Sequence, residues 1–442
     1  METILGRAKG TALDVIASSR TPIKVLTVLL PPHSHQIRYL ESRGNTWDKI
    51  VQFSEANNGP LPLLRTLKLA PREPFSPAVT PPPTPFFSNA INLEKFVLNS
   101  NAPRYLNHFV FPSLTALELT TSPVEALNAS ELLNFLKASP MLRTIQVKIS
   151  AEIMLEDIPR ELVVVLPNVE TFSLTVSNGT GINEIATHIS CPYARHTSLN
   201  DEIDDDYLES DIEIFPTPIM WNAIVPQYTR SPVKEVILDI SPDANPITAC
   251  SLIFRSSDGS VIRLGFKVSN TEADDDDLEL TLEEIGCEVF RQALRTIGDH
   301  PLVSNIKFLR ISFVGIFTHD RYLVRVANEF GRLFKSLGSL DVLSIRSCDF
   351  RSCLAQFLNL PELSGVERGV THPPIRELKI SYPALLYRRK ECQAAIVALA
   401  KSQYERGVSF ERVTIPEEGP FTDGRMLERL KPWVGTVDSV EE

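Results

Sequence analysis

The sequence predicts a mixed α/β solenoid, in which a unit of one short strand and one helix repeats along the chain. Three observations support this fold. A six-residue apolar motif recurs throughout the 442 residues, amphipathic helical segments separate its copies, and the residues inside each motif alternate between apolar and polar. We expect a curved array with a parallel β-sheet on its concave face, helices outside, and repeats of irregular length.

The strand motif has the form apolar–x–x–apolar–x–apolar. Weaker copies lie at residues 37–40, 194–199 and 261–266. In five clear copies a proline lies two residues before the motif. Proline at this position prevents a helix from continuing and favours an extended backbone. We therefore expect a strand at each clear copy, and these begin at Leu64, Leu93, Leu114, Leu142, Val169, Val233, Ile306, Leu340, Ile375 and Phe410.

Segments with helical periodicity lie between the motifs. In each of them apolar residues recur at intervals of three and four, which is the signature of an amphipathic helix. Thr46 and Ser130 stand where helix caps are expected, ahead of two of these segments. The predicted helices cover residues 47–56, 131–137, 283–297, 321–337 and 391–403.

The spacing of the motifs indicates a leucine-rich-repeat array. Successive copies from Leu64 to Val169 begin 21 to 29 residues apart, and the last four copies 34 or 35 apart. Leucine-rich repeats measure about 20–29 residues. Ordering one unit of about 30 residues costs on the order of 45 kcal/mol, whereas three buried leucines return only about 5–9 kcal/mol. Units must therefore stack, and we expect one solenoid over residues 1–433 with a frayed tail at 434–442.

A doubly wound α/β enzyme is the alternative, because it too alternates helix and strand. Its strands are buried on both faces and read as near-continuous apolar runs. Here a charged residue separates the apolar ones, as Lys68, Glu118 and Lys379 do. A sheet with one solvent-exposed face favours the solenoid over the doubly wound enzyme fold.

Three segments interrupt the array. Residues 70–86 hold seven prolines and predict an exposed polyproline-like loop, in which Ser76, Thr80 and Thr84 precede proline. Residues 201–213 and 272–284 each hold eight carboxylates and no Lys or Arg, and predict solvated acidic loops. Together they carry sixteen negative charges. The net charge of the remaining chain is therefore +5, although the net charge of the whole chain is −11. We hypothesise that one acidic loop covers the basic sheet positions as a client-displaceable lid.

The polar positions of each strand face the concave side, because side chains alternate. Towards the C-terminal half these positions become cationic, and we expect a staggered basic column there. An acidic client segment would supply its counter-charge; solvated strand positions with no partner are the alternative. The candidate partner-binding residues are Thr144, Ser173, His196, Arg263, Lys267, Arg310, Arg346, Lys379 and Arg412.

Enzymatic chemistry is not indicated, since no nucleotide-binding, zinc-protease or serine-hydrolase motif is found. The six cysteines are scattered, and His33 and His35 read as a polar loop, so we expect no metal and no cofactor. The negative net charge of the chain argues against nucleic-acid binding. No secretory or membrane-spanning segment is recognised, which predicts a cytoplasmic or nuclear protein.

Several short sequence segments resemble those of a known protein family. Residues 6–15, 53–67, 189–192, 195–199 and 221–224 look like segments of the leucine-rich-repeat, F-box-type proteins of mushroom-forming fungi. The resemblance implies that the repeats are the client-binding region of a ubiquitin ligase substrate receptor. The F-box itself, which would contact the cullin-ligase adaptor, is not recognised ahead of Leu13. An adaptor partner is thus implied only with an upstream F-box, and the alternative is a ligase-independent scaffold or decoy.

Overall fold

The computed structural model of the chain forms two compact units. Met1–Glu202 and Ile224–Arg230 make unit 1, and Ile203–Ala223 and Ser231–Glu442 make unit 2. The structure describes residues 10–56, 60–71, 86–100, 106–122, 126–150, 153–154, 162–177, 182–204, 228, 231–243, 247–269, 291–295, 297–298, 305–313, 329, 332–333, 336–347, 375–381, 389–405, 407–416 and 424–440.

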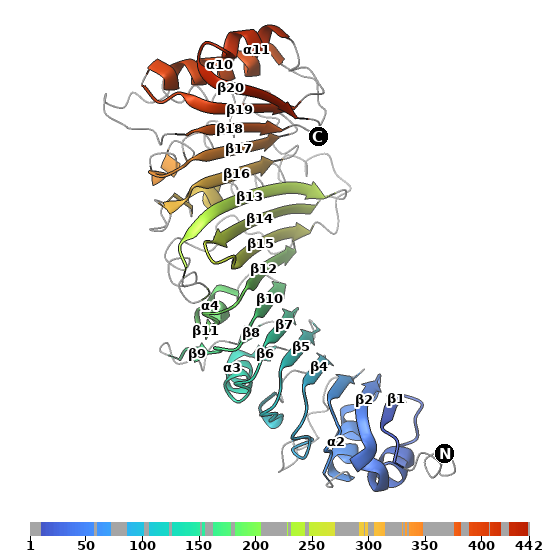
Figure 1. The fold of residues 1–442 in the computed structure, drawn as a ribbon. Coiled ribbons are helices and arrows are strands. Elements are labelled where there is room, and N and C mark those ends of the chain that lie inside the picture. The colour runs from blue at the N-terminus through green and yellow to red at the C-terminus, as the bar shows by residue number, and fades with distance from the viewer. Residues whose placement is uncertain are drawn as a thin grey trace. The chain divides into compact units, whose positions relative to one another are not determined.

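Unit 1 contains a parallel sheet whose strands follow one another in chain order (Figure 1). Each strand is hydrogen-bonded in parallel to the next described strand of this sheet. This is the expected parallel order for the motifs of the first half. The strands are β1 (Leu13–Ser18), β2 (Ile37–Arg43), β3 (Thr66–Ala70), β4 (Lys95–Ser100), β5 (Ala116–Thr121), β7 (Thr144–Ile149), β10 (Thr171–Ser177) and β12 (His196–Asp204).

The apolar motif positions form the core of unit 1. In β10, Phe172 and Leu174 are buried while Ser173 between them is half-buried. Register places Phe172 beside Ile145 of β7, so each motif position stacks on its counterpart. This alternation is the one-sided burial expected of a sheet with one wet face.

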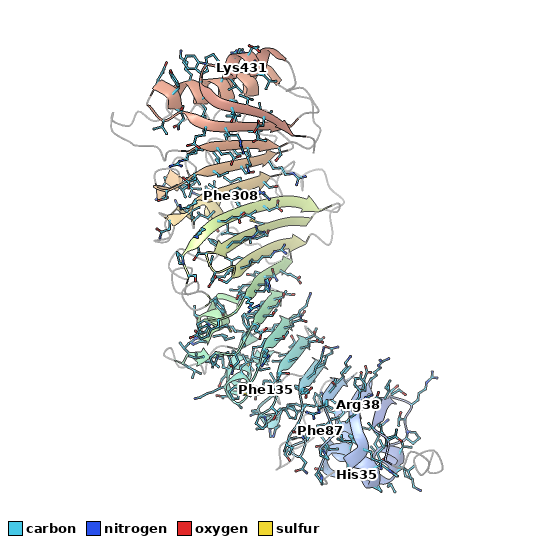
Figure 2. All side chains as sticks on the ribbon, viewed as in Figure 1. His35, Arg38, Phe87, Phe135, Phe308 and Lys431 are labelled. Atoms are coloured by element: carbon cyan, nitrogen blue, oxygen red, sulfur yellow. The ribbon has the colours of Figure 1, made fainter. Side chains whose placement is uncertain are left out.

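Short helical and extended segments cover the buried side of this sheet. Helix α3 (Ala129–Lys137) places Phe135, labelled in Figure 2, with its ring centroid 6.1 Å from that of Phe96. The side chain of Asn128 caps α3 by accepting from the N–H of Glu131 at 3.2 Å, two residues earlier than the expected Ser130. The other elements are η1 (Val25–Leu29), η2 (Pro31–Gln36), α2 (Trp47–Ala56), η3 (Leu106–His108), α4 (Ile182–Thr187), and two strand pairs, β6 (Leu127–Asn128) with β8 (Ile153–Met154) and β9 (Val164–Val165) with β11 (Ile189–Ser190).

Unit 2 joins an antiparallel meander to a parallel run of strands. The sheet order is β15-β14-β13-β16-β17-β18-β19-β20 (Figure 1). From β13 onward the pairing is parallel. The strands are β13 (Val233–Asp243), β14 (Ile247–Ser256), β15 (Val261–Ser269), β16 (Phe308–Phe313), β17 (Val342–Ser347), β18 (Glu377–Ser381), β19 (Phe410–Pro416) and β20 (Val434–Val440), and the helices are α10 (Arg389–Glu405) and α11 (Gly424–Leu430).

The meander corrects the expected copy at residues 261–266. That segment is part of β15, which pairs antiparallel with β14. A tight turn joins the two strands, where Gly259 has φ +88°. The Asp258 carboxylate accepts from the Ser231 hydroxyl (2.7 Å) and the Ser260 backbone N–H (2.9 Å). The turn chemistry makes a hairpin where the apolar pattern alone indicated a repeat.

The C-terminal segment also differs from expectation. Residues 434–440, predicted to be frayed, form β20 and pair in parallel with β19. Val434 is buried, and the Thr436 hydroxyl donates to the carbonyl of Glu411 at 2.9 Å. A Cβ at Gly435 would lie 2.8 Å from that carbonyl oxygen, so glycine permits the close approach of the two strands.

The three predicted insertions are only partly described. Asp201–Asp204 is not loop but the end of β12, a correction to the first acidic segment. Ala70 ends β3, and Phe86 pairs with Phe109 in an isolated bridge. Residues 72–85, 205–213 and 272–284 lie outside the described residues, as do Ser76, Thr80, Thr84 and the proposed lid.

Candidate functional site

The outward positions of neighbouring unit 1 strands form polar rows. Thr144 and His196 lie on either side of Thr171, and Ser173 occupies the next row between Gln146 and Ser198. All three predicted residues of unit 1 therefore share one sheet face. Their row neighbours are neutral, so this face offers hydrogen-bonding groups rather than a concentrated charge.

Charged pairs lie elsewhere on the unit 1 face, among them Lys95 with Glu118. Arg43 donates to both Glu41 carboxylate oxygens, at 2.6 and 2.9 Å, and the Tyr39 hydroxyl donates to the same carboxylate at 2.7 Å. These bonds, above all those from Arg43, hold the pKa of Glu41 below its ordinary value against the cost of burial. Lys148 lies 3.0 Å from Glu202. These side chains satisfy one another within the sheet.

The face of the unit 2 sheet is hollowed into a groove of about 730 Å³. Four of the six predicted cations line it: Arg310 on β16, Arg346 on β17, Lys379 on β18 and Arg412 on β19. These four predicted residues therefore share one recess of the sheet face. The full lining is Ile237, Asp239, Arg310, Ser312, Ser344, Arg346, Glu377, Lys379, Ile380, Ser381, Arg412, Thr414, Ile415 and Asp438.

The other two predicted cations do not belong to this lining. Arg263 lies on β15 opposite Ile253 and is exposed. Lys267 is also in β15, but its side chain lies outside the described residues. Register places Arg263 in the same row as Arg310, with Ile253 of β14 and Ile237 of β13 between them, so two apolar positions interrupt the basic column.

The groove is not the uniformly basic column that the sequence predicted, because carboxylates alternate with the cations. Glu377 lies 3.5 Å from Lys379 and 3.8 Å from Arg412. Asp438 lies 3.2 Å from the Nε of Arg412. Parallel pairing brings Glu377 directly beside Arg412, so two of the four cations are already neutralised by their own sheet.

Arg310 and Arg346 have different surroundings. The Arg310 guanidinium lies over the ring of Phe308, labelled in Figure 2, with Cζ 5.6 Å from the centroid. Among the described residues, neither arginine has a carboxylate within salt-bridge distance. A cation over an aromatic face keeps its in-plane N–H donors available. The β16–β17 end of the groove therefore retains free positive charge.

Sequence reasoning missed the acids and the serines of the groove. Asp239, Glu377 and Asp438 stand at outward strand positions, as the cations do. Ser312 and Ser344 do too, and they are only 7% and 5% exposed. The signal was present in the motif, whose non-apolar positions can be followed strand by strand whatever their charge.

The other chemistry-bearing groups that the structure describes are separated or buried. Within the described part of the chain, no group of three or more His, Cys, Asp or Glu is placed to hold a metal ion. Cys191 and Cys250 are buried, and burial raises the pKa of both thiols far above its ordinary value. His33 and His35, predicted to lie in a polar loop, lie in the short helix η2.

No described helix has both the length and the apolar character needed to cross a membrane. No protein-family model and no curated protein sequence matches the chain.

Proposed function

We propose that this chain is a protein–protein interaction module of the leucine-rich-repeat solenoid type, and that the unit 2 groove binds its client protein. The groove itself is the observation that carries the proposal. It lies on the wet face of a sheet, its floor is made by parallel strands, and its charged rim is half-exposed. A recess with convergent polar groups is the usual form of a binding site.

A binding role fits the groove better than catalysis. Glu377 is shared between Lys379 and Arg412, and Asp438 is paired with Arg412. Carboxylates engaged in this way are poorly suited to proton transfer, which needs a group poised near the working pH. The buried thiols described above are equally unsuited to nucleophilic attack. We therefore propose a non-enzymatic protein.

The resemblance to F-box-type leucine-rich-repeat proteins supports a more specific role. In that role the repeats select a client for a cullin-type ubiquitin ligase, in the cytoplasm or nucleus. A ligase-independent scaffold or decoy is the second candidate. Co-purification of the cullin adaptor with the natural full-length product supports the first role, and its absence from that product supports the second.

The general proposal is tested by comparing the proteins that co-purify with the wild-type chain and with two variants. The groove variant carries Arg346→Glu and Lys379→Glu; the matched control carries Lys401→Glu and Lys431→Glu on the α10–α11 side of the unit. We expect a defined set of proteins to be lost from the groove variant and kept by the control. Identical sets for all three proteins would overturn the proposal, provided that circular dichroism shows all three to be folded.

A further inference from the structure

Two arginines and two serines form a checkerboard at the β16–β17 end of the groove. Parallel register sets Arg310 opposite Ser344 and Ser312 opposite Arg346. With strands about 4.8 Å apart and alternate residues about 6.7 Å apart, the two arginine Cα atoms lie roughly 8 Å from each other across the diagonal. All four side chains line the groove. We call these four residues the Arg–Ser quartet.

The serine hydroxyls of the quartet have no hydrogen-bond partner among the residues that the structure describes. Ser312 and Ser344 are more than nine-tenths buried, yet no hydrogen bond is found for either hydroxyl among the described residues. Neither hydroxyl oxygen is among the fully enclosed atoms that lack a partner, so both remain accessible from the groove. The arginines beside them also lack ion-pair partners in the described chain, so four donors face one recess, with the carboxylate of Asp239 on the neighbouring strand beside Ser312.

The rest of the groove presents a different charge environment. Lys379 and Arg412 are neutralised by Glu377 and Asp438, at distances of 3.2 to 3.8 Å. Asp239 lies directly beside Ser312 across the β13–β16 pairing. Asp239 thus borders the quartet, whereas Glu377 on β18 and Asp438 on β20 lie farther along the groove. Together these carboxylates repel a run of negative charges or a nucleic-acid backbone.

We propose that the quartet binds one carboxylate of an otherwise uncharged client segment. Each carboxylate oxygen then accepts from one guanidinium and one serine hydroxyl, which matches the two oxygens to the four donors. A phosphate monoester brings three oxygens and nearly twice the charge into the field of Asp239, and fits less well. The carboxylate is either an Asp or Glu side chain or a chain terminus. This inference rests on the proposed function and refines the predicted acidic segment to a single acid.

Degenerate peptide libraries passed over the immobilised full chain test this inference. Four blocked nonapeptide libraries share uncharged flanking residues, and differ at the centre in Asp, Asn, phosphoserine or four consecutive Glu. A fifth has central Asn and a free C-terminal carboxylate. Retained peptide is measured by mass spectrometry for wild type, Arg346→Gln, Ser344→Ala and Arg412→Gln, with Arg429→Gln on α11 as the matched control.

We expect wild type to retain the Asp library about tenfold more than the Asn library, as a charge-assisted contact of this kind provides. Arg346→Gln and Ser344→Ala should remove most of this preference, whereas Arg412→Gln and Arg429→Gln should keep it. Preference for the free C-terminus over central Asp assigns the carboxylate to a chain end, and the reverse assigns it to a side chain.

Three results would overturn the inference. The first is equal retention of the Asp and Asn libraries. The second is stronger retention of the phosphoserine library than of the Asp library. The third is strongest retention of the four-Glu library, with Arg346→Gln and Arg412→Gln reducing that retention equally. The last result leaves the groove as a general acidic-segment site. Failure of the proposed function is distinguishable, because it appears as identical co-purifying proteins in the groove and control variants.

Discussion

The guanidinium of Arg412 is paired with the carboxylate of Asp438 across strands β19 and β20, with Nε 3.2 Å from Oδ2. Arg412 also lies 3.8 Å from Glu377 on its other side. An exposed, outward-facing arginine in this sheet is therefore not necessarily available to bind an anion, because a neighbouring carboxylate can already pair with it. Its neighbours in the row decide what it can bind, and this distinction separates Arg412 from Arg346 within the same groove.

Removing the Asp438 carboxylate should increase the attraction of the groove for negative peptides. We expect Asp438→Asn to tighten the binding of a decaglutamate peptide about threefold, the scale of one exposed ion pair. Fluorescence polarisation at low salt measures the change, which should vanish at high salt as the charges are screened. Asp14→Asn, in unit 1, is the matched control, and an equal gain there would contradict the explanation.

The residues at the starts of the strands form a second charge pattern. Arg376, immediately before β18, lies 3.9 Å from both Asp341, immediately before β17, and Glu411, the second residue of β19. We expect Arg376→Glu to lower the free energy of unfolding by about 1 kcal/mol at low ionic strength, because it sets three like charges side by side. Urea denaturation measures this loss.

The loss caused by Arg376→Glu should shrink markedly in 1 M NaCl, where the screening length falls to about 3 Å. Arg20→Glu provides the control, since Arg20 has no ion pair among the described residues. A salt-independent loss would mean that Arg376 acts through packing.

The core of unit 1 depends on Phe96. Its ring centroid lies 4.9 Å from that of Phe109 and 5.2 Å from that of Phe111, and it is fully buried. We expect Phe96→Ala to reduce the free energy of unfolding by about 3–5 kcal/mol. Ile91→Ala, at a residue 58% exposed, should change it by less than about 0.5 kcal/mol. Similar effects from both variants would contradict this account of the core.

Glu41 should make stability depend on pH. Because hydrogen bonding from Arg43 lowers its folded pKa, its contribution is present above the ordinary carboxyl pKa and is lost as pH falls through the folded value. We expect Glu41→Gln to cost about 1.5 kcal/mol at pH 7, and this difference to diminish below about pH 4.3. Urea titrations at several pH values measure it; a constant difference would show that the ionised carboxylate is not responsible.

Much of the fold was predictable, because the apolar motif specifies both strand and burial. The strands at Leu64, Leu142 and Val169 follow their motifs closely, and the predicted helix at residues 47–56 is α2. The antiparallel β14–β15 pair was not predicted, since its apolar pattern resembles a repeat and only the turn at Asp258 and Gly259 distinguishes it. β20 was missed because a short polar-rich strand is stabilised by pairing with β19 more than by its own sequence.

The groove was predictable in position but not in charge. Alternation alone placed Arg310, Arg346, Lys379 and Arg412 on one face. Which cations stay free depends on pairing register, and register is set by strands that lie far apart in the sequence. Following every outward position, rather than the cations alone, would have revealed the pairing of Glu377 with Arg412.

Site-specific photo-crosslinking tests the client-binding role of the groove most directly. A benzophenone amino acid replaces Thr414 in the groove in one full-length protein and Lys401 on α10 in another, and each is irradiated in cells. The account predicts that the Thr414 position crosslinks to defined protein partners whose capture is abolished by Arg346→Glu, whereas the Lys401 position does not. Crosslinks to the same partners from Lys401, or crosslinks from Thr414 unaffected by Arg346→Glu, would contradict it.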